Sequence, residues 1–298
     1  MLTLADLIES EQGIRLECAS IGISEAVVDS RQAISGSLFV AIESGHQYVK
    51  AAFKNGAHLA LVQSDFDADV PVLDLTNPVT AETRIPEAPF AIRVKDTTNC
   101  LQKWSTFWRS KFNLRIIGIT GSVGKSTTKE LVADVLSQRY CTLKNIGNYN
   151  NEVGLPLTML RLGPGYERAV LEMGFYKKGE IKLLCDLAHP HVGILTNIGT
   201  VHAERAGSQV EIAEGKSELV QELPPSPEGT AILNLDDPWI VPMAKQTKAR
   251  VFFYGLDPKA DLWADQIESQ GLNGLHFRLH YQGEEYPMQA PVIGKHSI

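Results

Sequence analysis

Residues 116–131 constrain the fold more than any other part of the chain. An apolar run that begins at Ile116 is followed by a turn rich in glycine and serine, and then by residues that favour a helix. A strand, a loop and a helix in this order can cradle phosphate. Glycines let backbone N–H groups point inward, and the helix N-terminus carries partial positive charge. The segment therefore predicts a nucleotide site at the end of a strand.

The loop itself reads T-G-S-V-G-K-S-T, which is shorter than the standard P-loop pattern. That pattern needs a glycine two residues before Gly121, where an isoleucine stands. Gly121 and Gly124 would bend the backbone, Lys125 would reach the β- and γ-phosphates, and the Ser126 hydroxyl would ligate Mg²⁺. A chance turn before a helix is the alternative, and the flanking strand and helix argue against it. The predicted ATP-binding residues of the loop are Gly121, Ser122, Val123, Gly124, Lys125, Ser126 and Thr127.

Composition narrows the class of protein. The chain has 298 residues, of which 44% are hydrophobic and 21% charged, so it can form two ordinary globular domains. Its net charge of −7 argues against a nucleic-acid partner. The four cysteines are scattered without a C-x-x-C pair, which favours reduced thiols over a disulfide framework or a zinc site. With no signal peptide and no apolar run near ~18 residues, we expect a cytoplasmic protein without membrane insertion.

The order of apolar and polar segments predicts an α/β fold with two domains. Residues 1–95 are expected to form a small α/β domain, and 96–298 a central nucleotide-binding domain. From residue 115 onward strands and helices alternate, which predicts a mostly parallel sheet with helices on both faces. Residues 275–293 predict an antiparallel hairpin instead. Because ligands collect at the carboxyl ends of parallel strands, we expect the loop, Glu172, residues 197–202 and residues 234–237 to share one site.

Two side chains that follow apolar strands are candidate metal ligands. Glu172 ends the strand 169–172, and a carboxylate in that place beside a phosphate loop is suited to hold Mg²⁺. The alternative for Glu172 is an acid in a solvated loop. His202 follows the strand 192–197, where a histidine is more often structural than a ligand, so its own context favours the structural interpretation.

Lys216 lies in the middle of an apolar helix face. In the predicted helix 210–223 it is four residues after Ile212, three before Leu219 and seven before Leu223. A core-facing ammonium group is unfavourable unless it is paired or modified. A snorkelling lysine is one alternative. A lysine in a functional site is the interpretation that we favour.

Two asparagine-containing segments can be either plain turns or ligand contacts. Asn148 and Asn151 lie in the segment N-I-G-N-Y-N-N-E-V-G-L-P, whose residues tolerate irregular loops but also offer amides to a polar ligand. Asn234 and Asp237 follow a predicted strand, and Asp237 could accept hydrogen bonds from ribose hydroxyls.

Taken together, these motifs resemble the Mur ligases, and most closely the MurF type. The short phosphate loop is that family's own pattern. The resemblance runs through the whole chain, with D-S-R at 29–31, G-S-L-F-V-A-I at 36–42, D-T at 96–97, G-I-T-G-S-V-G-K-S-T at 118–127, N-Y-N-N-E-V-G-L-P at 148–156, L-E-M-G at 171–174, G-E-I at 179–181, N-I-G-x-x-H at 197–202, G-K-S-E-L at 215–219 and N-x-D-D at 234–237.

The resemblance implies an ATP-dependent amide ligase of peptidoglycan synthesis. Such an enzyme adds D-alanyl-D-alanine to a UDP-N-acetylmuramoyl-tripeptide through an acyl phosphate. By this resemblance Lys125, with one Mg²⁺ on Ser126 and Glu172, would act on the γ-phosphate, and His202 would ligate a second Mg²⁺. Lys216 would be carbamylated and would become a metal partner. The resemblance also implies contacts of Ser30 and Arg31 with the UDP part of the substrate, of Asn148 and Asn151 with its muramoyl-peptide part, and of Asn234 and Asp237 with adenosine.

The chain departs from the family pattern in two places. Residues 43–46 are shorter than the family's Gly and Asp-Gly-His loop, and the sequence stops at 294–298, where the family continues into a third domain. We therefore expect a fragment or a short ligase, monomeric, that binds ATP·Mg²⁺ weakly and makes no product alone. A non-catalytic binding module is the alternative from another class. A folylpolyglutamate synthase is the alternative within the superfamily, and the D-S-R domain argues against it.

Overall fold

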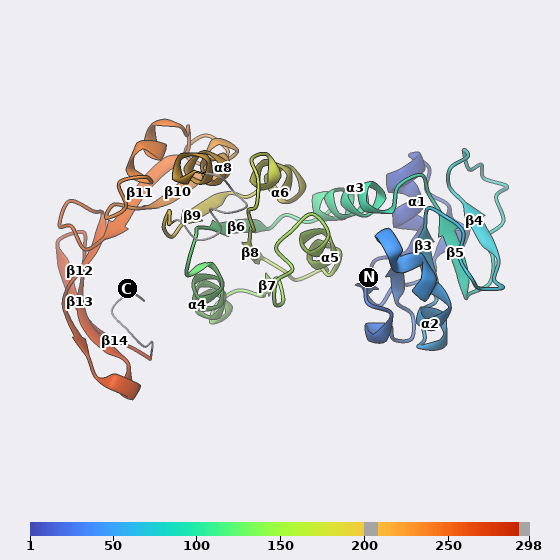
Figure 1. Ribbon diagram of the computed structural model, residues 1–298, viewed down its shortest axis with the longest axis horizontal. Helices are drawn as coiled ribbons and strands as arrows, with labels where there is room; N and C mark the ends of the chain where they lie inside the picture. The colour runs from blue at the N-terminus through green and yellow to red at the C-terminus, as the bar shows by residue number, and fades with distance from the viewer. Residues whose placement is uncertain (200–207, 292–298) are drawn as a thin grey trace. The chain divides into compact units, whose positions relative to one another are not determined.

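The computed structural model describes residues 1–199 and 208–291 and divides the chain into two compact units (Figure 1). The first unit comprises residues 1–114 and 145–167, and the second comprises 115–144 and 168–298. The predicted boundary near Lys95 falls inside the first unit. Helix α3 (Thr97–Ser110) belongs there because the indole of Trp108 donates to the carbonyl of Leu162 at 2.9 Å. The assignment of separate substrate and nucleotide domains stays a prediction.

Among the described residues, the first unit contains a parallel five-stranded sheet of order β1-β2-β3-β5-β4. Its strands are β1 (Ala26–Val27), β2 (Leu38–Val40), β3 (Leu59–Val62), β4 (Val72–Asp74) and β5 (Phe90–Arg93). Every residue of β2 and β3 is buried. Such continuous apolar runs are typical of parallel sheets that are covered on both faces.

The first unit contains the α-helices α1 (Leu4–Gln12), α2 (Val49–Lys54), α3 and α5 (Gly154–Leu160). Of these, α1 and α3 begin at polar side-chain caps. Asp96 caps α3, since its side chain accepts from the backbone N–H of Asn99 at 2.8 Å. Helix α5 was not predicted. It begins within the asparagine-rich segment, where the Asn151 side chain accepts from the Gly154 N–H at 2.8 Å.

The second unit contains, among the described residues, a nine-stranded sheet of order β14-β13-β12-β11-β10-β9-β6-β8-β7. Its strands are β6 (Arg115–Thr120), β7 (Thr142–Lys144), β8 (Arg168–Glu172), β9 (Val192–Leu195), β10 (Thr230–Asn234), β11 (Arg250–Gly255), β12 (Leu262–Ser269), β13 (Leu275–Tyr281) and β14 (Glu284–Ala290). The pairs from β7 to β12 are parallel, whereas β12, β13 and β14 pair antiparallel. The predicted α/β class with a mostly parallel sheet is confirmed.

Helices cover both faces of this sheet around β6. Helix α4 (Lys125–Ser137) lies on one side, and α6 (Glu180–Ala188) and α8 (Gln209–Gln221) lie on the other (Figure 1). Ile117 and Ile119 pack with Ala133 of α4. On the opposite face, a Cβ added at Gly118 would lie 3.0 Å from Leu219 of α8, so the missing side chain lets that helix approach the sheet.

The antiparallel end of the sheet confirms the predicted hairpin. β13 and β14 are joined by Gln282 and Gly283, whose φ angles are 51° and 84°. Two consecutive left-handed residues form the tight turn whose twist matches that of the flanking strands. In the part of the chain that the structure describes, no helix is long and apolar enough to cross a membrane.

Candidate phosphate-binding site

The phosphate loop joins the buried end of β6 to the first turn of α4. Gly121 has φ 152°, and a Cβ there would lie 1.9 Å from Thr196 Oγ1, so only glycine fits. Gly124 has φ 83° and leads the chain into α4, which begins at Lys125. The first four N–H groups of a helix have no intrahelical acceptor, and they attract anions. The N–H groups of Ser122 and Val123, two of the predicted ATP-binding residues, instead donate to Asn197. The contact of the loop residues with ATP stays a prediction.

Ser126 and Glu172 are brought together at the carboxyl ends of β6 and β8. Ser126 Oγ donates to Glu172 Oε2 at 2.7 Å, and the Glu172 residue is only 3% exposed. β8 pairs with β6 so that Glu172 lies opposite Ile119, one residue before the end of β6. A hydroxyl and a carboxylate oxygen at this separation match the hard oxygen ligands that Mg²⁺ prefers.

Lys125 and Lys216 both lie against the loop backbone. Lys125 Nζ donates to the carbonyls of Gly121 at 3.0 Å and Ser122 at 3.3 Å, and Lys216 Nζ donates to the Gly121 carbonyl at 2.9 Å. Burial, reinforced by the charge of Lys125, lowers the pKa of Lys216 to about 7. Burial also lowers the pKa of Lys125, and the carboxylate of Glu172 opposes that shift. At neutral pH a substantial fraction of Lys216 is therefore a neutral amine.

The predicted burial of Lys216 on the apolar face of α8 is confirmed. The residue is 4% exposed, and its ammonium group lies 4.9 Å from the centre of the Phe175 ring. The adjacent Gly215 makes this approach possible, because a Cβ there would lie 1.9 Å from the Phe175 ring. Phe175 follows β8, so the segment after Glu172 covers the lysine.

Glu218 has a structural role that the sequence did not reveal. From α8 its two carboxylate oxygens accept the N–H groups of Gly179 at 2.7 Å and Lys182 at 2.9 Å. These groups lie at the N-terminus of α6, where a carboxylate satisfies unpaired donors and complements the helix dipole. Glu218 belongs to the motif G-K-S-E-L, and Gly179 belongs to the motif G-E-I. The sequence alone does not show that these two motifs lie in contact.

Asn234 and Asp237 lie where β10 ends and bond to the exit of β9. Asn234 Nδ2 donates to the carbonyl of Thr196 at 2.9 Å, and the N–H of Ile198 donates to Asp237 Oδ2 at 2.7 Å. The other oxygen of Asp237 accepts the N–H of Trp239 at 2.9 Å. Both side chains thus fix neighbouring loops at the sheet edge. Their contact with adenosine stays a prediction.

Four of the predicted substrate-binding residues belong to the first unit. Ser30 is buried in a short 3₁₀ helix, and Arg31 is exposed and forms an ion pair with Asp29 at 2.7 Å. Asn148 and Asn151 are exposed before α5. Their roles stay predictions, as does that of His202, which lies outside the described residues together with residues 294–298.

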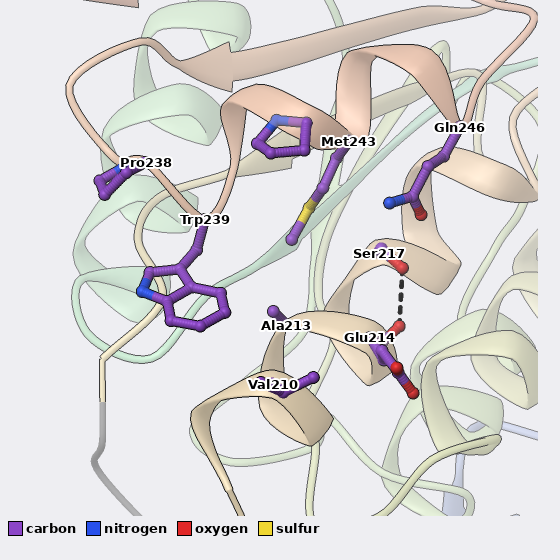
Figure 2. Close-up of a pocket in the computed structure, with 9 residues that line it drawn as sticks. Val210, Ala213, Glu214, Ser217, Pro238, Trp239, Met243 and Gln246 are labelled. Atoms are coloured by element: carbon purple, nitrogen blue, oxygen red, sulfur yellow. Dashed lines mark hydrogen bonds between the residues drawn. The ribbon is translucent and has the colours of Figure 1, made fainter.

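The second unit also has a cavity that is lined by none of the predicted site residues that the structure describes. It is a cavity of 560 Å³ between α8 and the segment 238–246. Figure 2 shows Trp239 and Met243 across from Val210 and Ala213, so its walls are mainly apolar. Ser217 Oγ donates to the carbonyl of Glu214 at 2.7 Å on the α8 side.

The chain is similar in sequence to a known family of proteins. The family model of the Mur ligase middle domain matches residues 119–298. A UDP-N-acetylmuramoyl-tripeptide–D-alanyl-D-alanine ligase of Synechocystis is 40% identical over 80% of this chain and 49% of its own length. The Bacillus subtilis ligase of the same name is 36% identical over 93% of this chain and 56% of its own. The chain thus spans about half the length of these curated relatives.

Solved structures agree with the sequence relatives. MurF from Acinetobacter baumannii matches with a TM-score of 0.78 and 28% identity, over 98% of this chain and 61% of that one. The MurF ligase of Thermotoga maritima in complex with ADP matches with a TM-score of 0.71 and 25% identity, over 89% of this chain and 57% of that one.

Proposed function

Because this chain belongs to the Mur ligase family, we propose that it supplies the nucleotide site of an ATP-dependent amide ligase of peptidoglycan precursor synthesis. The observation that carries the proposal is the 2.7 Å contact of Ser126 with Glu172. Beside it, the buried Lys125 and Lys216 lie against the same loop. A helix N-terminus with a lysine, and a hydroxyl and a carboxylate that can hold Mg²⁺, are groups that stabilise phosphoryl transfer.

The substrates follow from the names of the relatives. We propose that the ligase joins D-alanyl-D-alanine to a UDP-N-acetylmuramoyl-tripeptide. A carboxylate is a poor electrophile, so the γ-phosphoryl group of ATP is first transferred to it, giving an acyl phosphate and ADP. The amine of D-alanyl-D-alanine then attacks the acyl carbon, phosphate leaves, and the nitrogen loses a proton. The products are an amide, ADP and inorganic phosphate.

The residues of the site have different roles in this reaction. Lys125 would hold the γ-phosphate oxygens, and Ser126 and Glu172 would hold Mg²⁺, which would supply positive charge to the transferred group. Helix α4 directs its N-terminal donors at the phosphates. In the same proposal His202 binds a second Mg²⁺.

Lys216 is proposed to be carbamylated. A neutral amine adds to CO₂ and releases one proton, which turns the side chain into an anionic carbamate. Burial supports this reaction, because it lowers the pKa of Lys216 to about 7 and so provides the neutral amine. A carbamate would place an oxygen ligand where the structure has an ammonium group beside Gly121.

The remaining contacts complete the proposal. Ser30 and Arg31 are proposed to contact the UDP part of the substrate, and Asn148 and Asn151 its muramoyl-peptide part. Asn234 and Asp237 are proposed to face adenosine, and they also hold the exit of β9.

Two measurements test the proposal. Calorimetry with ADP and ATP, each with Mg²⁺, should detect binding to the 298-residue chain and loss of that binding in Lys125→Ala. Phosphate release should be assayed with ATP, Mg²⁺, UDP-muramoyl-tripeptide and D-alanyl-D-alanine, using the 298-residue chain and the product of its complete reading frame. We expect release by the complete product only when both substrates are present, and no amide from the chain alone. Absence of release with any muramoyl-peptide would refute the ligase function.

A further inference from the structure

The middle of the phosphate loop is tied to the residues that follow β9. The N–H of Val123 donates to Asn197 Oδ1, and Asn197 Nδ2 donates to the carbonyl of Val123, both at 3.0 Å. The Val123 carbonyl also accepts Thr196 Oγ1 at 2.7 Å. One residue earlier, the Ser122 N–H donates to the carbonyl of Asn197 at 2.9 Å.

The side chain of Ser122 also bonds to the segment that follows β9. Its hydroxyl accepts the N–H of Gly199 at 2.9 Å and donates to the carbonyl of Gly199 at 3.2 Å. The backbone N–H groups of Ser122 and Val123 therefore both point toward the β9 exit. Both donate to acceptors of Asn197, whereas the start of α4 provides N–H groups without an intrahelical acceptor.

An asparagine at position 197 matches this task chemically. The backbone of Val123 presents one donor, its N–H, and one acceptor, its carbonyl, and a primary amide offers the complementary pair. An aspartate would supply acceptors alone and would face the Val123 carbonyl with a second oxygen. Alanine would supply neither group.

The backbone on both sides of Asn197 is held by residues at the end of the neighbouring strand β10. Asn234 holds the carbonyl of Thr196, and Asp237 holds the N–H of Ile198, so the residues on both sides of Asn197 are anchored to the end of β10. Asn197 itself is half-buried, and its substitution removes little apolar packing. The loop is thus fastened through hydrogen bonds rather than through a core contact.

We propose that Asn197 is a positioning residue that holds the phosphate loop in its binding conformation before nucleotide arrives. By binding the N–H and the carbonyl of Val123 it fixes the path of the chain into Gly124, and hence the direction of the first N–H groups of α4. A preformed loop binds more tightly because no ordering is required on binding. This inference rests on the proposed nucleotide site.

The first test needs no nucleotide. Amide hydrogen exchange of residues 121–126 should quicken in Asn197→Ala and, to a smaller extent, in Asn197→Asp, which keeps the acceptor for the Val123 N–H. Asn273→Ala is the matched control, because that exposed asparagine lies in a turn between β12 and β13. Equal exchange of the loop in wild type and Asn197→Ala would overturn the proposal.

The second test measures the dissociation constants of ADP and ATP with Mg²⁺. We expect Asn197→Ala to weaken both by about tenfold or more, with a melting temperature close to that of wild type. Thr196→Ser, which keeps the hydroxyl donor, should bind more tightly than Thr196→Val. A parallel loss of stability and affinity would reduce Asn197 to a structural residue and contradict the proposal. If wild type binds no nucleotide, the proposed function fails, and the exchange experiment still decides whether Asn197 orders the loop.

Discussion

Lys125 and Lys216 donate hydrogen bonds to the same carbonyl oxygen, that of Gly121, at 3.0 and 2.9 Å. Two ammonium groups at one acceptor repel each other, and the charge of Lys125 accordingly adds to the lowering of the Lys216 pKa. An arriving polyphosphate would offset that repulsion. The carbonyl of Gly121 therefore brings the two lysine amino groups together, and this closeness favours the neutral form of Lys216.

The buried amine makes stability depend on pH. Lys216 has a pKa of about 7 in the folded chain, against 10.5 for an ordinary lysine. Between these values the unfolded state binds the additional proton, so the contribution of this group to stability rises as the pH rises. The unfavourable contribution is complete below pH 7, where it is on the order of 5 kcal/mol. We predict that Lys216→Met is more stable than wild type at pH 7 and that the difference shrinks toward pH 10.

Urea unfolding at several pH values, in buffer freed of bicarbonate, measures this difference. Lys177→Met is the control, because that lysine is exposed near the start of α6 and should show no comparable pH-dependent difference. A constant difference between Lys216→Met and wild type from pH 7 to 10 would show that Lys216 does not titrate in this range.

Glycine at the start of the loop is required for two reasons. Gly121→Ala would bring a Cβ to 1.9 Å from Thr196 Oγ1 at a φ of 152°, so we expect a loss of roughly 2–5 kcal/mol in unfolding free energy. Gly124→Ala adds a Cβ in open space at a φ of 83°, and should lose only about 1–2 kcal/mol. Gly163→Ala, with open space and no left-handed φ, should be within about 0.5 kcal/mol of wild type. Chemical denaturation ranks the three variants, and another order would contradict the stated cause.

We predict that the effect of Mg²⁺ on nucleotide affinity depends on the carboxylate of Glu172. Glu172→Gln removes the negative charge beside Ser126 while keeping the side-chain shape. We expect nucleotide affinity in the presence of Mg²⁺ to fall by roughly tenfold or more, with little change in its absence. Titration of ATP with and without Mg²⁺ measures both values, and the exposed Glu228→Gln is the control. An unchanged magnesium effect in Glu172→Gln would remove this residue from the metal site.

The link from α8 to α6 should contribute to stability. Glu218→Gln leaves one acceptor for two N–H groups and removes the charge at the α6 N-terminus, so we expect a loss of about 1–2 kcal/mol. Glu214→Gln, whose partner is the exposed Lys178, should change stability by less than about 0.5 kcal/mol. Thermal unfolding and amide exchange at residues 179–182 compare the two, and equal effects would argue against a capping role.

Several parts of the fold were predictable because local residue patterns determine them. The apolar run that ends in Gly121 specifies the strand and loop, and the Gln282-Gly283 pair fits the tight hairpin. The face of α8 that contains Lys216 follows from helical periodicity alone. Each of these features depends on residues that are close in sequence.

Other elements depend on distant partners and were not predictable. Helix α5 contains Pro156 in its first turn, where the missing N–H does no harm, but the preceding asparagines resemble a loop. Strand β12 has mixed burial and is set by pairing with β11 and β13. The roles of the Asn197 and Glu218 side chains are likewise absent from the local pattern, because Val123 lies 74 residues from Asn197 and Gly179 lies 39 residues from Glu218.

The division of the chain has a consequence for how it folds during synthesis. The first unit needs residues 145–167, since Trp108 bonds to Leu162, yet residues 115–144 of the second unit are translated before them. When the ribosome completes the first unit, the phosphate loop and α4 have already emerged without most of their sheet. The apolar side of α4 can be buried only after β8 and β9 have been synthesised, because it packs against residues of those strands. The first unit therefore cannot complete its contacts until the first 30 residues of the second unit (115–144) have been synthesised.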